Sequence, residues 1–422
     1  MNQLNYPALG ERLYKTKLPN GLTVIVLPRK GFSRKIAYFV TDFGAIHTEF
    51  TLDGEPMRVP DGVAHFLEHK LFDLPGRDVT AEFAALGASP NAFTSFDMTA
   101  YYFNCTDNFE KCLRLLLEFV STPYFTEESV AKEQGIIAQE IGMNLDSPYS
   151  RVFEKLMGMS YRNHPVTVPI LGTVETIGQI TPKILYDCHR AFYTPSNMTL
   201  CVVGDVEPDT VADIAMEITG DIEAPNVTRA EQWQEDMTCI TPYGEENMEI
   251  AMPTFQIGFK CEPVPHGEAG VLGELVADLA SEVLFGESSA LYLKMYEEGL
   301  IDTSFGGGLE VLEGMAMLMV SGDSEDPKAV RDAIIAQAKV IAGEKIPEED
   351  FRRMKRSAMG RRLRSLDNFD TTCFRLCAYH MMDYDYFEFP KVYEQVQEAD
   401  IREFLARVVT EERCAMSVIL PL

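Results

Sequence analysis

The sequence predicts an α+β protein made of two homologous layered halves. Its 422 residues exceed what one typical hydrophobic core holds together, so two or more domains are expected. In both halves, short runs rich in β-branched and aromatic residues alternate with longer amphipathic segments, which indicates helices layered on sheets. The second half also repeats the first, because VADLASEVLF at Val276 aligns without gaps with VAHFLEHKLF at Val63.

The repeat extends well beyond this pair of segments. EEDFRRMKRSAMGRR at Glu348 follows the plan of EESVAKEQGIIAQEI at Glu127, in which an acidic turn opens an amphipathic helix. A polar, acidic stretch that contains two prolines separates the copies. We therefore predict an N-terminal half at 1–220, a linker at 221–244 and a C-terminal half at 245–422.

Four strands are expected in the first half. Residues 22–27 follow an Asn-Gly turn and stop at a proline, and residues 36–41 form a second apolar run. Residues 91–103 are dense in aromatic and β-branched side chains, so one strand is expected there. Residues 198–203 form the last of these strands, before a Gly-Asp turn.

Helices are expected between these strands, because apolar residues recur there every three or four positions. Gly87 provides a stop signal for a short helix, and Thr126 provides an N-cap for a long one. The expected helices span residues 63–72, 81–86, 109–120, 127–144, 148–161, 182–192 and 209–218.

The helix at 63–72 carries two histidines and a glutamate in the order HxxEH. His65 and His69 are four residues apart, so both imidazoles project from one helix face, one turn apart. Two neutral imidazoles at this spacing can bind one divalent ion, and nitrogen ligands in a tetrahedral site favour zinc. Glu68 lies close enough to reach a water molecule on the same ion. The alternative is an ordinary amphipathic helix that happens to contain two histidines.

The helix at 127–144 supplies two candidate carboxylates. Glu133 and Glu140 are seven residues apart, which is two helical turns, so they share a face. Two histidines alone leave a metal site without a third protein ligand, and either glutamate could supply one if the two helices pack together. The alternative is that both carboxylates form a solvated edge beside an apolar stripe.

Only the first half keeps this set of residues. In the aligned second half, the positions of His65, Glu68, His69, Glu133 and Glu140 hold Asp278, Ser281, Glu282, Met354 and Arg361. All five positions differ together, as expected if the five residues serve one function in the first half. We interpret the remaining histidines of the first half, His47, His164 and His189, as loop or structural residues.

Composition limits the partners and the compartment. A net charge of −28 argues against nucleic acid and anionic membrane surfaces as partners. The sequence contains no apolar run of about 20 residues, so no transmembrane helix is expected, and no signal peptide is evident. The nine cysteines are scattered through apolar segments, as expected for reduced core thiols in a reducing compartment, so we expect a cytoplasmic protein. Cys373, Cys377 and His380 could form a second metal site, but a cysteine pair on a helix usually only packs.

These segments resemble the pitrilysin-like (inverzincin, HxxEH) zinc metallopeptidases, the family of insulin-degrading enzyme and mitochondrial processing peptidase. The similarity covers nearly the whole chain. The segments that carry it are LPNGLTVIVLP, HFLEH, GASPNAFTSFDMTAYYF, EQGIIAQEI, PILGTVETI, FYTPSNM and VVGDV.

The resemblance implies a role for each candidate residue. Zn²⁺, one ion per chain, would be held by His65, His69 and Glu140. Glu68 would be the catalytic base, and Glu133 would support the site through one of the ligands. The strand that contains Asn91, Ala92 and Phe93 would pair with an extended peptide substrate.

One segment departs from the family pattern. Active members carry an Arg and a Tyr in the second half, in a segment like LREKxGLAY, to hold the substrate carbonyl. Here LKMYEEGLIDTSF places Met295 and Asp302 at those positions, while Tyr292, Lys294 and Tyr296 lie nearby but out of register. In two-subunit members the pair can lie on the other chain. We therefore expect a second pitrilysin-like subunit in a heterodimer, or a homodimer.

The resemblance thus implies a zinc-dependent endopeptidase whose two halves form a clamshell. It would cleave peptides or unfolded segments inside an enclosed chamber, with a partner that supplies the missing Arg and Tyr. Two alternatives stay open. One is a non-proteolytic structural or scaffolding subunit of the same family, and the other is a processing subunit dedicated to one peptide.

Overall fold

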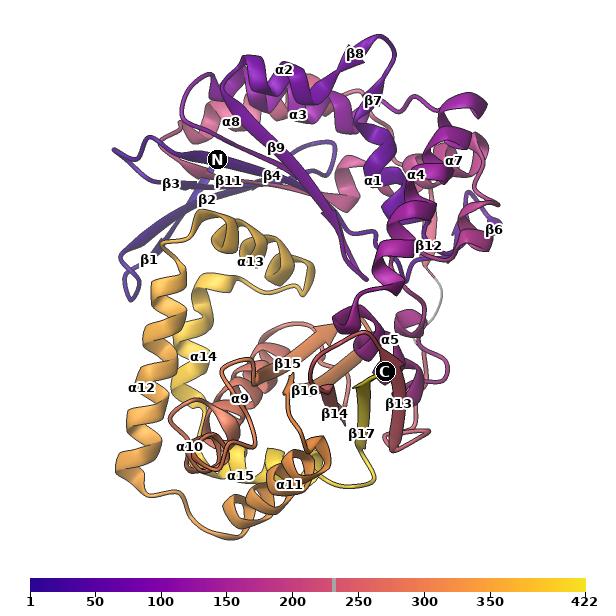
Figure 1. Cartoon of the computed structure of the whole chain (residues 1–422). Helices are drawn as coiled ribbons and strands as arrows, with labels where there is room; N and C mark the ends of the chain where they lie inside the picture. The colour runs from indigo at the N-terminus through magenta and orange to yellow at the C-terminus, as the bar shows by residue number, and fades with distance from the viewer. Residues whose placement is uncertain (230–232) are drawn as a thin grey trace. The chain divides into compact units, whose positions relative to one another are not determined.

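Each of two packing units is built on one large β-sheet (Figure 1). The computed structural model describes residues 1–229 and 233–422. The first unit comprises Met1–Ile141, Val168–Glu231 and Leu363–Phe387, and the second comprises Gly142–Thr167, Gln232–Arg362 and Glu388–Leu422. Within the described residues, no helix combines the length and the apolar character needed to cross a membrane.

The sheet of the first unit has the strand order β1-β2-β3-β11-β4-β10-β9. β3 runs parallel to β11, and the other neighbouring pairs run antiparallel. The apolar strands β3, β11 and β4 lie in the middle of the sheet and are almost wholly buried. The strands are β1 (Asn2–Tyr6), β2 (Glu11–Lys17), β3 (Thr23–Pro28), β4 (Lys35–Thr41), β9 (Ala88–Thr94), β10 (Thr99–Cys105) and β11 (Met198–Gly204).

The sheet of the second unit repeats this arrangement. Its order, β13-β17-β14-β16-β15, corresponds strand for strand to β3-β11-β4-β10-β9. The one parallel pair, β13 with β17, also lies at the corresponding place. This shared topology confirms the predicted fold class of two duplicated mixed α/β halves. The strands are β13 (Tyr243–Met248), β14 (Thr254–Cys261), β15 (Gly306–Leu312), β16 (Met315–Asp323) and β17 (Cys414–Pro421).

Helices cover both faces of the first sheet. α1, α2, α3 and α8 pack on one face, and α13 packs against β4 and β11 on the other face (Figure 1). The helices of this part are α1 (Val63–Leu71), α2 (Val79–Ala85), α3 (Phe109–Ser121), α4 (Glu127–Leu145), α6 (Val174–Ile177), α7 (Pro182–Phe192), α8 (Pro208–Thr219) and α13 (Phe369–Met381).

On each sheet, one of the packed helices comes from the other half of the sequence. α5, from the first half, packs on β13, β14 and β17, just as α13, from the second half, packs on the first sheet. Each of these helices follows a long helix, α4 or α12, whose residues are divided between the two units. The helices of the second half's sheet are α5 (Pro148–Ser160), α9 (Glu268–Phe285), α10 (Ala290–Glu297), α11 (Pro327–Gly343), α12 (Glu348–Ser365), α14 (Phe389–Gln395) and α15 (Glu398–Val408).

The elements predicted for the first half agree with the structure within two residues, with one exception. Residues 91–103 were expected as one strand, and this prediction was wrong, because β9 and β10 form an antiparallel hairpin. Ser95 closes the turn: its N–H donates to the Met98 carbonyl at 2.8 Å, and its hydroxyl accepts from the Met98 N–H at 3.2 Å. The strands β1 and β2 were not anticipated.

The predicted division at 1–220, 221–244 and 245–422 stays a prediction about homologous halves. The stretch 221–244 contains β12 (Val227–Arg229), which pairs with β5 (Glu49–Leu52), itself paired with β6 (Glu55–Arg58). Residues 230–232 of this stretch lie outside the described residues.

The cysteines are core thiols, as predicted. All nine are free and eight are buried. Cys373 and Cys377 on α13 pack against Cys201 of β11, and His380 Nδ1 lies 3.2 Å from Lys15 Nζ. Within the described parts of the chain, these residues belong to no cluster that could hold a metal ion.

Two glycines set the position of α1. Gly62, the residue before this helix, has φ 89°, and a Cβ there would lie 2.5 Å from the Leu171 carbonyl oxygen. Gly172 has φ 69°, and a Cβ there would lie 2.5 Å from the Asp61 carbonyl oxygen. Both positions therefore require glycine for backbone conformation and for space. The N-terminus of α1 is thereby held against the loop that precedes α6.

In the second half, ion pairs connect the helices that correspond to α1 and α4. Arg361 Nη2 lies 2.7 Å from Glu282 Oε2. Arg362 Nη2 lies 2.6 Å from Glu274 Oε1 and 3.1 Å from Asp278 Oδ2. The three carboxylates recur every four residues, so they share one face of α9. The contact of Arg361 with Glu282 matches the aligned pair Glu140 and His69, which supports the register of the repeat.

This arrangement predicts that Arg362 stabilises the second unit. Its side chain is 8% exposed, and removing one partner leaves carboxylates without their counter-charge. Arg362→Met should lower the free energy of unfolding by about 2–4 kcal/mol in urea denaturation followed by circular dichroism. Arg353→Met is the matched control on the same helix. Because the Arg353 side chain is 64% exposed, its loss should cost less than about 0.5 kcal/mol. Equal effects of the two substitutions would contradict this role.

Candidate metal centre

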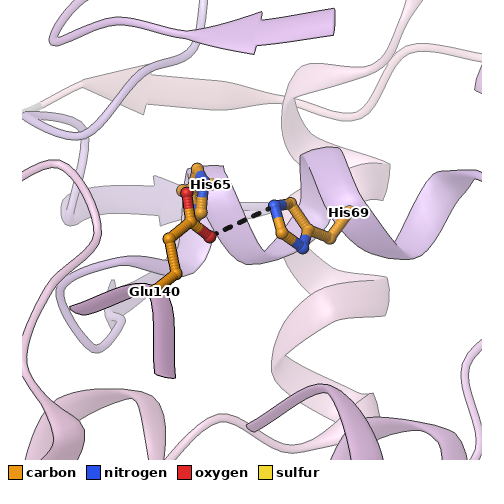
Figure 2. Close-up of side chains that lie close together, drawn as sticks. All are labelled: His65, His69 and Glu140. Carbon is orange, nitrogen blue, oxygen red and sulfur yellow. Dashed lines mark ion pairs between the residues drawn. The ribbon is translucent and has the colours of Figure 1, made fainter. Parts of the chain in front are cut away.

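α1 and α4 bring two histidines and a glutamate together in the first unit. His65 and His69 lie one turn apart on α1, with ring centroids separated by 4.6 Å. On α4, Glu140 Oε1 lies 3.7 Å from His65 Nε2, and Glu140 Oε2 lies 3.6 Å from His69 Nε2. One donor atom from each residue lies within 4.8 Å of the others. Figure 2 shows the three side chains turned toward one another.

Apolar anchoring on both helices positions these side chains. On α1, Ala64, Leu67 and Leu71 are buried in the core, which leaves His65 and His69 at the edge of that buried face. On α4, Ile137 and Ile141 are buried in the same core. Glu140 therefore emerges beside the buried stripe of α4 rather than on its far side.

Glu133 contacts one of the histidines through the nitrogen that faces away from Glu140. Glu133 Oε1 lies 2.9 Å from His69 Nδ1, and this hydrogen bond raises the pKa of His69. A carboxylate accepts, so Nδ1 carries the proton and the Nε2 lone pair is directed at the cluster. The Nδ1 atom of His65 is buried and has no hydrogen-bond partner among the described residues.

The protonation state of His65 suits a metal ligand. Burial, with a smaller contribution from the neighbouring His69, lowers the pKa of His65 to about 4. This imidazole is therefore neutral at pH 7, and a neutral imidazole has a lone pair to donate.

The three donor atoms fit a zinc ion. Two nitrogens and one carboxylate oxygen are a typical catalytic zinc set, which leaves a fourth position open. Donors at bond lengths of about 2.0–2.1 Å in a tetrahedral site lie about 3.4 Å apart. The two imidazoles approach different oxygens of the same carboxylate, His65 Nε2 at 3.7 Å from Oε1 and His69 Nε2 at 3.6 Å from Oε2, and with one oxygen the three donor atoms lie within 4.8 Å of one another. The Glu140 side chain is 43% exposed, so a small molecule can reach this side of the cluster.

Glu68 lies beside the cluster without belonging to it. Burial raises the pKa of its carboxyl group. The hydroxyl of Thr94, the last residue of β9, donates to Glu68 Oε2 at 2.6 Å. Thr94 was not singled out in the sequence. The available signal was strand alternation, which puts Thr94 on the same face as Ala92.

The predicted substrate strand is β9, which ends the first sheet. Asn91 Nδ2 donates to the hydroxyl of Tyr102 at 3.0 Å, and Asn91 Oδ1 accepts from the Ala92 N–H at 2.9 Å. The Phe93 ring lies 6.0 Å from the ring of Phe374 on α13. In the described part of the chain, the outer edge of β9 pairs with no further strand.

The other residues considered in the sequence lie outside this cluster. Met295, on α10, is buried, and Asp302 Oδ1 accepts from the Ser304 N–H at 2.7 Å, so both have structural contacts in the second unit. His164 and His189 each lie within 2.9 Å of a backbone carbonyl oxygen through Nε2, as structural histidines do. His47 is a buried loop residue whose Nδ1 accepts from the Gly44 N–H at 2.9 Å.

Two family models match this chain. The model described as insulinase (peptidase family M16) matches residues 58–174, which contain the cluster. The model described as peptidase M16 inactive domain matches residues 179–358.

Curated relatives and solved structures agree with these matches. The chain is 37% identical to a protein named uncharacterized zinc protease YmfH of Bacillus subtilis (strain 168), over 99% of both chains. The fold of this chain is similar to that of an M16-like peptidase of Alicyclobacillus acidocaldarius, with 32% identity and a TM-score of 0.92. The match covers 97% of this chain and 98% of that one. A protease of Helicobacter pylori shares the fold at 17% identity and a TM-score of 0.83, with coverage of 97% and 100%. This chain therefore belongs to peptidase family M16, the pitrilysin-like metallopeptidases.

Proposed function

We propose that this chain is a zinc-dependent endopeptidase. The observation that carries the proposal is the convergence of His65, His69 and Glu140, with Glu68 beside them. The zinc proteases among its relatives support a metal at this place. A bound zinc ion would lower the pKa of a water molecule and polarise the scissile carbonyl.

Each residue of the chain has a role in the proposed reaction. Glu68 takes a proton from the attacking water and later gives it to the leaving amine. Glu133 keeps the His69 ring in one orientation and one tautomer. The peptide adds as a strand along Asn91, Ala92 and Phe93, so backbone hydrogen bonds bind it with little demand on its sequence.

The proposed substrates are peptides or unfolded segments, because only an extended chain can pair with the edge of β9. Enclosure in a chamber stays a prediction from the family resemblance, and a cytoplasmic location stays a prediction from the cysteine pattern. The nine free cysteines favour a reducing compartment.

We propose that a partner completes the site. Met295 and Asp302 cannot donate hydrogen bonds to a substrate carbonyl as an Arg and a Tyr do. A second pitrilysin-like subunit would supply such donors, whereas a second copy of this chain would have to supply them from residues other than Met295 and Asp302. The same two residues favour a second candidate function, a non-proteolytic structural subunit of the family.

Glu68→Gln tests the proposed base. The amide cannot take a proton, so kcat should fall by about 10²–10⁴-fold, while bound zinc stays at the wild-type level. Cleavage of a mixed peptide pool and metal analysis provide the two measurements. Glu128→Gln, an exposed glutamate at the start of α4, is the matched control and should leave kcat unchanged. Wild-type cleavage by the Glu68 variant would show that this residue is not the base.

Substitutions of the two α4 glutamates distinguish a ligand from its support. Glu140→Ala removes a direct donor, so the zinc affinity should fall by more than about 100-fold. Glu133→Ala removes only the acceptor for His69 Nδ1–H, so the loss should be about 10–100-fold. Competition with a chelating dye measures both affinities. The reverse order would exchange the roles of the two residues.

The partner is tested with the purified chain alone. We expect one zinc ion per chain. The peptide pool should be cleaved only after addition of the protein encoded by the gene next to that of this chain, which is tested as the second subunit. Full activity of the purified chain would show that no second kind of subunit is needed. Zinc-loaded chain that stays inactive with the partner would favour the structural subunit.

A further inference from the structure

Thr94 joins the strand that would hold the substrate to the residue that would act as the base. Its hydroxyl lies 2.6 Å from Glu68 Oε2. That distance is a close hydrogen bond, and a hydroxyl that donates to an ionised carboxylate makes a stronger bond than one between neutral groups. Thr94 occupies one carboxylate oxygen and leaves Oε1 to accept a proton.

The backbone of Thr94 is held firmly on both sides. It pairs with Thr99 of β10, and the turn that follows it is closed by the Ser95–Met98 bond. The loop after β4 also packs against this turn: Ala45 N–H donates to the Ser95 carbonyl at 3.1 Å. A Cβ at Gly44 would lie 2.6 Å from the turn backbone, so the approach is close. The position of the Thr94 hydroxyl is therefore restricted by a backbone that is held in place on both sides.

Alternation along β9 links this bond to the peptide. Ala92 and Thr94 are two residues apart and face the same side of the sheet. Two residues of a strand span about 6.8 Å. A peptide paired with Asn91 and Ala92 would therefore lie at a set distance from the Glu68 carboxylate, because the same strand fixes both.

We propose that Thr94 is a positioning residue that orients the Glu68 carboxylate relative to the peptide bound on β9. The inference rests on the proposed function and deepens it. Among the described residues, no hydrogen bond joins the Glu68 carboxylate to His65, His69 or Glu140. The metal ligands therefore do not fix its orientation. Loss of the hydroxyl should affect the chemical step rather than substrate binding or metal binding.

Thr94→Val and Thr94→Ser test this role. Valine keeps the branched shape and removes the donor, so kcat should fall by about 10–100-fold with KM and bound zinc unchanged. Serine keeps the donor and should restore kcat to within about threefold of wild type. Thr16→Val, on β2 of the same sheet, is the control for loss of a strand hydroxyl and should leave kcat unchanged.

Crystal structures of the zinc-loaded wild type and both variants provide a readout that does not depend on activity. We expect one orientation of the Glu68 carboxylate in the wild type and in Thr94→Ser, and a displaced or divided one in Thr94→Val. An unchanged Glu68 in Thr94→Val, or a wild-type kcat for that variant, would overturn the inference while leaving the proposed peptidase intact. If the wild type were inactive with every peptide and partner, the proposed function would fail. The orientation of Glu68 would still decide whether Thr94 holds it.

Discussion

The structure depends on how two helices, distant in sequence, are held at one place beside a sheet. In the first half α1 presents two imidazoles to a carboxylate of α4, at separations of 3.6 and 3.7 Å. No side chain in that cluster supplies a permanent positive charge, so a metal ion is the natural cation for it. In the second half the corresponding helices carry Glu282 and Arg361, and a guanidinium supplies the charge directly. The corresponding pairs of helices thus carry two different polar sets, one that a metal ion would complete and one that an ion pair completes. A metal ion held by three protein ligands would leave a fourth position open for chemistry.

The reciprocal exchange of α5 and α13 ties the two copies of the fold together. Each sheet would otherwise expose one apolar face, since α1, α2, α3 and α8 cover only the opposite face of the first sheet. α13 buries Cys201 and its neighbours on β11, and α5 buries the corresponding face around Gly258. Neither half of the sequence therefore completes its own layers. This also explains why a division by packing differs from a division by homology: residues 142–167 and 363–387 pack with the half to which they do not belong in sequence.

Much of this architecture could be predicted, because the relevant signals are local. Apolar periodicity and stop signals located α1, α3 and α4 to within a residue at each end, and the HxxEH spacing on one helix face indicated a metal site. The hairpin β9–β10 was misread as one strand, because its turn, Thr94 to Thr99, contains no glycine or proline. Helix exchange was not foreseen, since helical periodicity identifies an apolar face but not the sheet that buries it. The bond from Thr94 to Glu68 needs a tertiary contact between β9 and α1, and single-sequence patterns do not supply one.

The distribution of donors argues for a site that is complete on one side only. In the proposed reaction, α1 and α4 would provide the metal ligands and the base, and Thr94 of β9 would orient that base. All of these groups would act on the water and on its proton. The developing negative charge on the substrate carbonyl needs donors on the opposite side, and such preorganised donors commonly contribute about 3–4 kcal/mol to the lowering of a barrier. In the segment where the family keeps them, this chain has a buried methionine and an aspartate that is engaged by Ser304. An aspartate there would repel a forming oxyanion, so those donors are better sought on another chain than in a rearrangement of this segment.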